Sequence, residues 1–324
     1  MKIGIVGATG EVGRTMIKVL EEFKIPVKKL RLFASKKSSG KTLIFNNTKI
    51  IIEELTENTM KEKYDFLLFS AGSNISKTFA PIAAKYGNIV IDNSSAFRME
   101  EDIPLVVPEI NGNIVKNYQG IIANPNCSTI QMVLSLYKVH EQFGIDEIFV
   151  STYQAVSGAG HKAIAELQKQ INGENITSVF PKPIAHNVIP LIGDTTTDGF
   201  TTEELKMINE TRKILNDYSI NVYPTTVRVP VFYGHSESIV VKTKIPFNEI
   251  SNVEKAIRKS KDVILKNEVI TPIEIAGSDY VYVSRLRKID ETRFALWNVA
   301  DNIRVGAATN AIRILMLKVG LLWK

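Results

Sequence analysis

"KIGIVGATGEVGRTMIKVLEEF" (residues 2–23) decides the fold of this chain. Its first five residues form a short apolar run, which is typical of a strand buried in a parallel sheet. Gly7, Gly10 and Gly13 follow at three-residue spacing, and an amphipathic pattern then continues through Leu20. This order of strand, glycine turn and helix is typical of dinucleotide-binding domains, where the backbone approaches a pyrophosphate at a helix N-terminus. A glycine-rich turn without a ligand is the alternative.

The second predicted strand indicates which nucleotide is bound. Sites for NAD usually place an acidic residue about 20 residues after the glycines, where it binds the ribose 2′-hydroxyl. Here "LRLFAS" ends in "SKKSSGK", and no acidic residue follows until Glu53. The loop instead offers hydroxyl groups and cations that suit a 2′-phosphate, namely Ser35, Lys36, Lys37 and Ser38. The sequence therefore favours NADP, although a solvated basic loop would have the same composition.

Apolar strands and helical stretches alternate up to the only cysteine. The strands are "YDFLLFSAG", "NIVIDNSSAFR" and "GIIANPNC", with the helical segment "ISKTFAPIAAKYG" between the first two. This alternation predicts a doubly wound parallel sheet, whose functional loops lie at the carboxyl ends of the strands. Because Gly72, Arg98 and Cys127 follow three such ends, we expect them at one edge of the sheet.

From about residue 145 the predicted strands become longer and more polar. They are "DEIFVSTYQAVSGAG", "TVRVPVFYGHSESIVVKTKIP", "YVYVSRLRKID" and "RFALWNVA", and "KIDETRFALW" is typical of a hairpin. We expect these strands to be antiparallel, with helices near 160–171, 202–215 and 251–265. The last apolar stretch, "GAATNAIRILMLKVGLLW", is expected to be a helix that rejoins the first domain. The predicted domains are residues 1–126 with 304–324, and residues 127–303.

Composition limits the class of protein. The hydrophobic fraction of 44% and the charged fraction of 23% are usual for globular proteins. One cysteine excludes an intramolecular disulfide and any metal site with several cysteines. The net charge of +6 favours anionic ligands, but no basic cluster with interleaved aromatic residues suggests nucleic acid. No signal peptide or membrane span is expected, so the sequence predicts a cytoplasmic protein.

Cys127 and His235 are the candidate reactive residues. Cys127 precedes the helical stretch "STIQMVLSLYK", and a helix N-terminus or a nearby protonated histidine would favour its thiolate. A buried, inert thiol is the alternative. His235 follows a strand that carries Arg228 and a bend at Gly234, although a histidine taken alone is more often a hydrogen-bonded structural residue. The four histidines show no metal-ligand spacing.

"TTEELK" predicts the first turn of a helix. Thr201 and Glu204 form a capping-box pattern. Glu203 and Lys206 lie three residues apart and therefore share one face of the helix. They are either an exposed surface pair or a site for a charged ligand. Arg98, taken alone, is likewise expected to be a solvated loop residue.

Several ordered motifs together resemble the aspartate-β-semialdehyde dehydrogenase family over essentially the whole chain. They are "GATGEVG" (7–13), "NPNCST" (124–129), "YQAVSGAG" (153–160), "EELK" (203–206), "RVPVFYGH" (228–235) and "GAATNA" (306–311). The resemblance implies an NADP-binding Rossmann domain with a returning C-terminal helix, and a mixed α/β domain for substrate binding and dimerisation. It also implies an enzyme of lysine, threonine, methionine and diaminopimelate biosynthesis, which is a homodimer or homotetramer.

The implied reaction is the NADP-dependent reductive dephosphorylation of L-aspartyl-4-phosphate to L-aspartate-4-semialdehyde through a thioester. By this resemblance Cys127 would be the nucleophile, Gln154 would orient the substrate carbonyl, and His235 would be the general acid/base. A thiol with a pKa near 8.5 is only a few per cent thiolate at neutral pH, so the thiol must be activated. Histidine suits proton transfer because its pKa lies close to working pH.

The resemblance also assigns the binding residues. Arg228 would bind the substrate α-carboxylate and Glu203 its α-ammonium group. Arg98 and Lys206 would hold phosphate, with Asn126 assisting. Arginine matches a carboxylate by two hydrogen bonds, whereas lysine is a point charge adequate for phosphate. The positions that match cofactor contacts are Gly7, Thr9, Gly10, Val12, Gly13, Ser35, Ser38, Gly72, Ser157 and Gly158.

Two other functions stay open at the level of sequence. N-acetyl-γ-glutamyl-phosphate reductases share the Rossmann start and the cysteine chemistry. Their cysteine usually has Gly and a Pro-Thr pair nearby, unlike "NPNCST", and they have no need of an ammonium contact from Glu203. A non-catalytic NADP-binding sensor would be expected to have lost Cys127 or His235, and both are present.

Overall fold

The chain divides into two compact units, and the computed structural model describes residues 1–322. Unit 1 comprises Met1–Pro125 and the C-terminal segment from Ala307, whereas unit 2 comprises Asn126–Gly306. Residues 323 and 324, which belong to the predicted returning segment, lie outside the described residues. None of the helices within residues 1–322 combines the length and the apolar character needed to cross a bilayer.

Unit 1 is built on a seven-stranded sheet with the order β3-β4-β2-β1-β5-β6-β7. Neighbouring strands run parallel, except that β3 and β4 form an antiparallel pair at one edge. The predicted parallel Rossmann sheet is therefore confirmed. Its strands are β1 (Lys2–Val6), β2 (Lys29–Ala34), β3 (Thr42–Phe45), β4 (Thr48–Glu54), β5 (Phe66–Phe69), β6 (Ile89–Asp92) and β7 (Ile121–Ala123).

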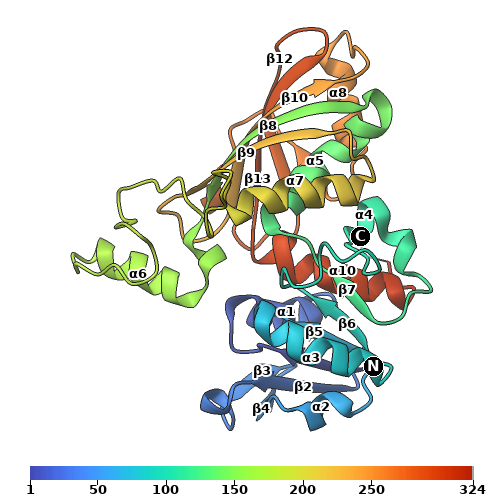
Figure 1. Ribbon diagram of the computed structural model, residues 1–324, viewed down its shortest axis with the longest axis vertical. Helices are drawn as coiled ribbons and strands as arrows, with labels where there is room; N and C mark the ends of the chain where they lie inside the picture. Colours follow the sequence, from blue (N-terminus) through green and yellow to red (C-terminus); the bar gives the residue numbers. More distant parts are fainter. Residues whose placement is uncertain (323–324) are drawn as a thin grey trace. The chain divides into compact units, whose positions relative to one another are not determined.

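Helices cover both faces of this sheet (Figure 1). The apolar core on one face includes Ile3, Leu20 from α1 and Ile312 from α10. The core on the other face includes Phe69 and Ala80 from α3. Burial on both faces explains why these strands are continuous apolar runs. The helical elements are α1 (Glu11–Glu22), α2 (Glu57–Lys61), α3 (Ser73–Lys85), α4 (Pro108–Asn111) and α10 (Thr309–Lys318), with the 3₁₀ turns η1 (Lys36–Ser38) and η2 (Gly112–Val115).

Unit 2 contains a mixed six-stranded sheet with the order β11-β12-β13-β10-β8-β9. The predicted hairpin is confirmed as the antiparallel pair of β12 and β13. The expectation of antiparallel strands is wrong for β8 with β9, which are parallel. Strand β11, which lies in a segment predicted as helix, also pairs in parallel with β12. The long helical connection from β8 to β9 permits the first of these parallel pairings. The strands are β8 (Ile145–Gln154), β9 (Asn221–Arg228), β10 (His235–Thr243), β11 (Val263–Leu265), β12 (Val281–Lys288) and β13 (Arg293–Ala300).

Three helices of unit 2 bury one face of this sheet. Met132 from α5, Met207 from α7 and Val253 from α8 share an apolar core with Ile239 and Leu296 of the strands. Residues of the opposite face, which include Phe149 and Tyr223, are partly exposed. The helical elements are α5 (Cys127–Phe143), α6 (His161–Ile171), α7 (Thr202–Leu215), α8 (Ile250–Arg258) and α9 (Pro272–Ile275), with the 3₁₀ turn η3 (Val156–Ala159) and the π-helical turn η4 (Arg304–Ala308).

The predicted helices near 160–171 and 202–215 are confirmed as α6 and α7, but the prediction near 251–265 is too long. Helix α8 ends at Arg258, and Asp262 adopts a left-handed backbone with φ of 63°. The following residues, Val263–Leu265, pair with β12 instead. A left-handed residue interrupts a right-handed helix, so the apolar pattern beyond it belongs to a strand.

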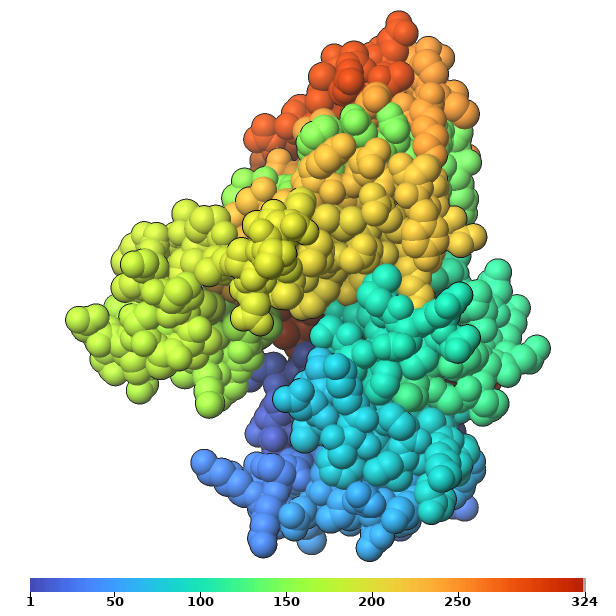
Figure 2. Space-filling model, in the orientation of Figure 1, coloured from blue at the N-terminus to red at the C-terminus, as the bar shows by residue number. Residues whose placement is uncertain are grey.

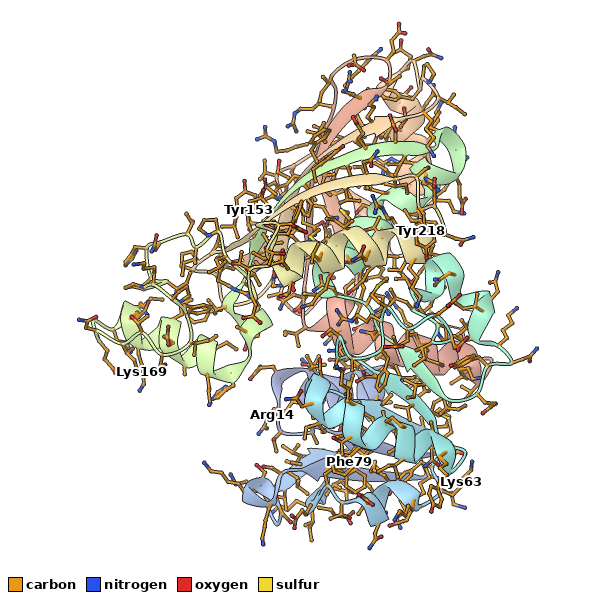
Figure 3. The ribbon with its side chains drawn as sticks, in the orientation of Figure 1. Arg14, Lys63, Phe79, Tyr153, Lys169 and Tyr218 are labelled. Carbon is orange, nitrogen blue, oxygen red and sulfur yellow. The ribbon has the colours of Figure 1, made fainter. Side chains whose placement is uncertain are left out.

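The connection between β8 and α7 forms a separate lobe of unit 2. It contains α6 and a long irregular segment, coloured yellow-green in Figure 2. Lys169 lies on the exposed side of α6 in this lobe, whereas Tyr153 lies on the sheet (Figure 3). Glu166 connects α6 to the irregular segment within the lobe: it is 2% exposed and accepts hydrogen bonds of 2.7 Å from the N–H groups of Ser178 and Val179.

Candidate active site

Cys127 is the first residue of α5, and Asn126 is the N-cap of that helix. Asn126 Oδ1 accepts hydrogen bonds from the N–H groups of Ser128 at 3.0 Å and Thr129 at 3.2 Å. This cap fixes the start of the helix, because the first N–H groups have no partner within it. The thiol is partly exposed and lies at the positive end of a 17-residue helix. That position favours a thiolate.

The N-cap residue is itself held by α7. Asn126 Nδ2 donates to Glu203 Oε1 at 2.8 Å, and the Asn126 backbone N–H donates to Glu210 Oε2 at 2.6 Å. Both carboxylates are buried, at 6% and 1% exposure. These two contacts lock the turn that carries Cys127 against the helix that carries Glu203.

The start of α7 confirms the predicted capping box. The Thr201 hydroxyl accepts from the Glu204 N–H, and Glu204 Oε2 accepts from the Thr201 N–H. Lys206 Nζ lies 2.9 Å from Glu203 Oε2, so the predicted pair on one helix face forms. Because Glu203 is buried while the Lys206 side chain is 31% exposed, this is not the exposed surface pair that the sequence left open.

His235 is fully buried at the start of β10. Its Nδ1 accepts a hydrogen bond of 3.0 Å from the Ala155 N–H, so Nε2 carries the proton of the neutral ring. Burial, together with the charge of Arg228, lowers the pKa of His235 to about 3. The expectation that a protonated histidine favours the thiolate is therefore wrong, because desolvation keeps this imidazole neutral near pH 7.

Arg228 supplies the positive charge that His235 does not. It is the last residue of β9, is 6% exposed, and donates from Nη1 to the Ala155 carbonyl at 2.7 Å. Burial lowers the pKa of Arg228, while the charges of Glu203 and Cys127 raise it. A guanidinium that interacts electrostatically with the sulfur of Cys127 stabilises its anionic form.

Gly158 leaves space beside both of these side chains. A Cβ atom at this position would lie 3.0 Å from Arg228 Nη1 and 3.1 Å from His235 Nε2. Those contacts are tighter than ordinary van der Waals distances, so the glycine is required where the chain passes over the two groups. The atoms that could bind and protonate a ligand therefore converge beside the backbone of η3.

Gln154 ends β8 on the strand next to Arg228. The two residues are paired in the β8–β9 register. Gln154 Nε2 donates to Thr152 Oγ1 at 3.4 Å and to Glu203 Oε1 at 3.5 Å. Unit 2 thus brings the predicted residues Asn126, Cys127, Gln154, Glu203, Arg228 and His235 together through direct contacts or electrostatic interactions.

Unit 1 has a separate pocket of about 560 Å³ at the carboxyl ends of its strands. Predicted cofactor residues line it, namely Gly7, Thr9, Gly10, Ser35 and Lys36. Other lining residues follow β5 or lie on α3, and they include Ser70 and Phe79, the latter labelled in Figure 3. Glu54, at the end of β4, also lines this pocket, whereas the carboxylate of Glu53 accepts from Arg31 Nε at 2.8 Å.

The glycine turn of this pocket fits a pyrophosphate. Gly7 has φ of 82°, and a Cβ atom on Gly13 would lie only 2.3 Å from the Gly7 carbonyl oxygen. Helix α1 starts after Gly10 without a side-chain cap, so its first N–H groups face the turn as donors for an anion. A dinucleotide fits these residues, as predicted.

The comparisons with known proteins agree with this geometry. Family models for the NAD binding domain and the dimerisation domain of semialdehyde dehydrogenases match residues 2–118 and 136–305. Aspartate-semialdehyde dehydrogenase of Aquifex aeolicus is 49% identical over 99% of both chains, and that of Bacillus subtilis is 40% identical over 97% of this chain and 96% of its own. Aspartate semialdehyde dehydrogenase II of Vibrio cholerae, solved in complex with ASA, is 44% identical with a TM-score of 0.94, over 99% of both chains. The chain belongs to the aspartate-semialdehyde dehydrogenase family.

The remaining family positions lie as follows. Val12 is on α1, Ser38 is in η1, and Gly72, with φ of 87°, is the N-cap of α3. None of these three, nor Gly13, is among the residues that line the 560 Å³ pocket. Arg98 is 7% exposed, and it donates to the carbonyls of Asn93 and Asn124 at 2.9 Å. Its guanidinium is buried against backbone carbonyls, so Arg98 is not the solvated loop residue that the sequence left as an alternative.

Asn302, which lies near this cluster, was not predicted from the sequence. Asn302 Oδ1 accepts from the Gly234 N–H at 3.0 Å, and its Nδ2 donates to Ser157 Oγ at 3.0 Å. It thereby ties the turn before His235 to the turn that carries Ser157. A Cβ atom on Gly306 would lie 2.6 Å from Cys127 Cβ. "GAATNA" pointed to Gly306, but the sequence has no signal for Asn302. Within residues 1–322 no group of three or more potential metal ligands occurs.

Proposed function

We propose that this chain catalyses the NADPH-dependent reductive dephosphorylation of L-aspartyl-4-phosphate to L-aspartate-4-semialdehyde through a thioester on Cys127. The observation that carries this proposal is the position of Cys127, partly exposed at the first residue of α5 and in electrostatic contact with Arg228. Family membership supports the same reaction. The proposed step belongs to the formation of lysine, threonine and methionine from aspartate, in the cytoplasm.

The thiolate is proposed to attack the acyl carbon of the substrate. A carbon–sulfur bond forms, the carbon–oxygen bond to phosphate breaks, and inorganic phosphate leaves with the electron pair. The helix N-terminus and the Arg228 cation favour the anionic sulfur. When bound, the nicotinamide cofactor supplies a hydride to the acyl carbon, and cleavage of the carbon–sulfur bond then releases the aldehyde and regenerates the thiolate.

His235 is proposed to handle the proton of the reacting oxygen. Its Nδ1 is occupied by the Ala155 N–H, so Nε2–H is the atom that can donate. Nε2 is buried beside Gly158, and none of the described residues forms a hydrogen bond with it. An imidazole in this state donates to an oxygen that develops negative charge during addition, and takes the proton back when the aldehyde carbonyl forms. Gln154 is proposed to orient that oxygen.

The charges of the cluster are proposed to match those of the substrate. Arg228 would bind the α-carboxylate and Glu203 the α-ammonium group, each as an opposite charge in a largely buried position. Lys206 and Arg98 would hold phosphate, with Asn126 assisting. For the cofactor we propose NADP, because Ser35 and Lys36 line the pocket and can bind a 2′-phosphate. Ser38, Ser157 and the glycines of the family pattern complete the proposed cofactor contacts.

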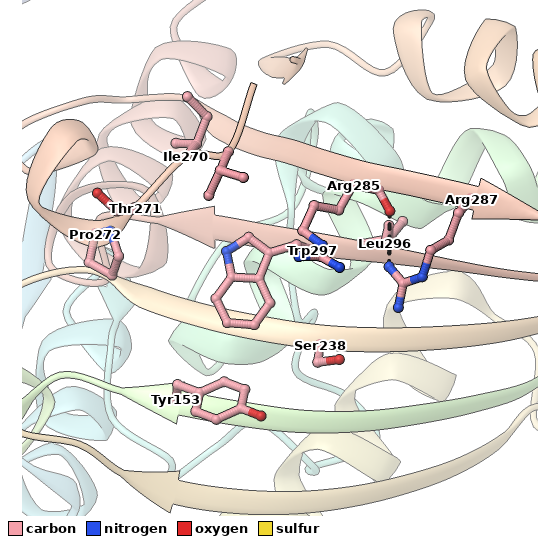
Figure 4. A pocket seen from close by; sticks show the side chains of 10 residues that line it. Tyr153, Ser238, Ile270, Thr271, Pro272, Arg285, Arg287, Leu296 and Trp297 are labelled. Atoms are coloured by element: carbon pink, nitrogen blue, oxygen red, sulfur yellow. Dashed lines mark hydrogen bonds between the residues drawn. The ribbon is translucent and has the colours of Figure 1, made fainter. Parts of the chain in front are cut away.

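A second copy of the chain is proposed to cover the open face of the sheet of unit 2, giving a homodimer that could pair into a tetramer. Phe149 and Tyr223 are stacked on this face with ring centroids 4.8 Å apart, yet they are 44% and 48% exposed. A pocket of about 350 Å³ on the same face is lined by Tyr153, Ser238 and Trp297 (Figure 4). The family model for the dimerisation domain supports this assignment.

One assay tests the proposed reaction. Purified protein is mixed with phosphate, NADP⁺ and a semialdehyde, and the absorbance of NADPH is followed. We expect turnover with L-aspartate-4-semialdehyde and not with N-acetylglutamate semialdehyde. Turnover only with the acetylated compound would contradict the proposal in favour of the related reductase. Turnover with neither would favour a non-catalytic sensor. Replacement of NADP⁺ by NAD⁺ in the same assay tests the cofactor.

A further inference from the structure

One carboxylic acid is buried beside the catalytic cluster without a role in the proposed reaction. Glu237 lies on β10, two residues after His235, so both side chains point to the helix-covered face of the sheet. Its exposure is 0%. Its cross-strand neighbours are Thr152 on β8 and Asn298 on β13, which are also fully buried. Burial of an acid costs free energy unless it has a partner, so a specific role is expected.

Gln131 connects this acid to the two catalytic residues. It lies on α5, one turn after Cys127, and its exposure is 0%. Gln131 Nε2 donates to the His235 carbonyl oxygen at 3.4 Å, and its backbone carbonyl accepts from Asn298 Nδ2 at 2.9 Å. Its side chain also interacts with the carboxyl of Glu237, and this interaction lowers the pKa of the acid by less than burial raises it. Among residues 1–322, no hydrogen-bond partner reaches Gln131 Oε1 or either carboxyl oxygen of Glu237, and all three atoms are buried.

Glu237 is able to supply the missing donor. Burial raises the pKa of Glu237 well above its usual value, so the group is a neutral acid with an O–H at neutral pH. The elements packed around it bring few ionisable groups: Cys127 on α5, and the neutral His235 on its own strand. On the flanking strands, Thr152 and Asn298 carry no charge. A carboxyl O–H that donates to Gln131 Oε1 satisfies a buried acceptor that otherwise has none.

We propose that Glu237 is a positioning residue, whose carboxyl holds the Gln131 side chain so that Gln131 fixes His235 relative to the helix turn that carries Cys127. Glu237 does not touch the substrate in this assignment, and acts only through Gln131. The effect on turnover rests on the proposed function, because it requires proton transfer by His235. The predicted change in the position of the His235 ring does not depend on the proposed function.

Two substitutions and a matched control test this role. Glu237→Leu removes the hydrogen bond at similar volume, whereas Glu237→Gln keeps the shape and an N–H donor for Gln131 Oε1. Ser284→Ala is the control, because Ser284 is buried on β12 but pairs with Trp297 on the opposite face of the sheet. In the semialdehyde assay, kcat is counted per active site from the burst of NADPH formed without phosphate, so that misfolded protein does not enter the value.

We expect Glu237→Leu to lower kcat about tenfold or more with KM within about twofold, because small displacements of a catalytic group are costly. Glu237→Gln and Ser284→Ala should keep kcat within about twofold of the unsubstituted protein, and Glu237→Gln should keep its pH profile. Unchanged kcat in Glu237→Leu would overturn the proposal. An equal loss in Glu237→Gln would also overturn it, since an ionised carboxylate would then be needed.

A second readout is independent of activity. The chain has four histidines, so ¹⁵N-histidine NMR spectra resolve few ring signals, and His235→Asn identifies that of His235. We expect Glu237→Leu to shift the His235 ring signals, and Ser284→Ala to leave them in place. If the unsubstituted protein has no semialdehyde activity, the proposed function fails, and the spectra still decide the inference. If Glu237→Leu does not fold, Gln131→Met breaks the same link. A native His235 spectrum in Gln131→Met would overturn the assignment.

Discussion

The backbone N–H of Ala155 donates a hydrogen bond of 3.0 Å to Nδ1 of His235, and this contact determines which nitrogen of the ring carries the proton. With Nδ1 as an acceptor, the single proton of the neutral imidazole is on Nε2, which faces Gly158. Ala155 also accepts from Arg228 Nη1 through its carbonyl at 2.7 Å. One peptide residue between β8 and η3 therefore orients both the proposed acid/base and the proposed carboxylate-binding group.

His235 gives the free energy of unfolding a specific pH dependence. Burial lowers the pKa of the folded-state imidazole to about 3, so the ring takes up a proton in the unfolded chain at higher pH than in the folded one. Stability therefore falls as the pH drops below about 6.5, by about 2 kcal/mol near pH 5. His235→Asn should lack this loss. Urea unfolding at pH 7.5 and 5 measures it, and an identical pH dependence in both proteins would contradict the folded-state pKa.

Arg228 and His235 should affect different kinetic constants. Arg228→Leu removes a charge-assisted contact to the substrate carboxylate, so KM for the semialdehyde should rise about tenfold to hundredfold. His235→Asn removes the Nε2–H donor and should lower kcat about hundredfold or more with little change in KM. Arg293→Leu is the control for loss of an arginine, because Arg293 forms an exposed ion pair with Asp290. The reverse pattern would mean that the two roles are exchanged.

Gly158→Ala tests whether the reaction needs the space between the backbone of Gly158 and the side chains of Arg228 and His235. The added methyl would lie within 3.1 Å of both Arg228 Nη1 and His235 Nε2, so one of them must move. We expect kcat/KM to fall about tenfold or more, as misplacement of catalytic groups usually causes. Ala159→Ser, at the exposed neighbouring position of η3, should keep normal activity. Equal activity in both variants would show that ligand does not approach along this turn.

The loop after β2 should set the preference for NADP. Lys36 lines the nucleotide pocket, whereas Lys37 is not among its lining residues. Lys36→Glu should raise KM for NADP⁺ about tenfold or more, since it replaces a cation near the 2′-phosphate by an anion beside Glu54. KM for NAD⁺ should change much less. Lys37→Glu makes the same change in charge outside the pocket, and an equal effect of both substitutions would argue against a specific 2′-phosphate contact.

The fold was predictable because its signals are local. Strand periodicity, the glycine turn at 7–13 and the capping box at Thr201 each act over a few residues, and each is confirmed. The end of α8 was missed because a left-handed Asp262 is invisible in an apolar pattern that suits helix or strand. The parallel pairing of β8 and β9 likewise depends on contacts far apart in the chain.

The candidate site, like the fold, has some residues that local motifs identify and others that depend on contacts distant in sequence. Residue types at motif positions pointed to Cys127 and His235, but the neutral state of His235 follows from burial that only the folded structure reveals. Burial likewise decides against the solvated alternative for Arg98. Asn302 and Glu237 act through partners that are distant in sequence, so no local pattern could have identified them.

The most direct test of the central claim is to trap an acyl group on the thiol of Cys127. Protein is mixed with L-aspartate-4-semialdehyde and NADP⁺ without phosphate, quenched in acid, and digested for mass spectrometry. The account predicts a burst of NADPH with about one equivalent per active site, and an aspartyl group on the peptide that contains Cys127. Cys127→Ala should give neither. A burst of NADPH without this adduct, or turnover by Cys127→Ala, would contradict the thioester route.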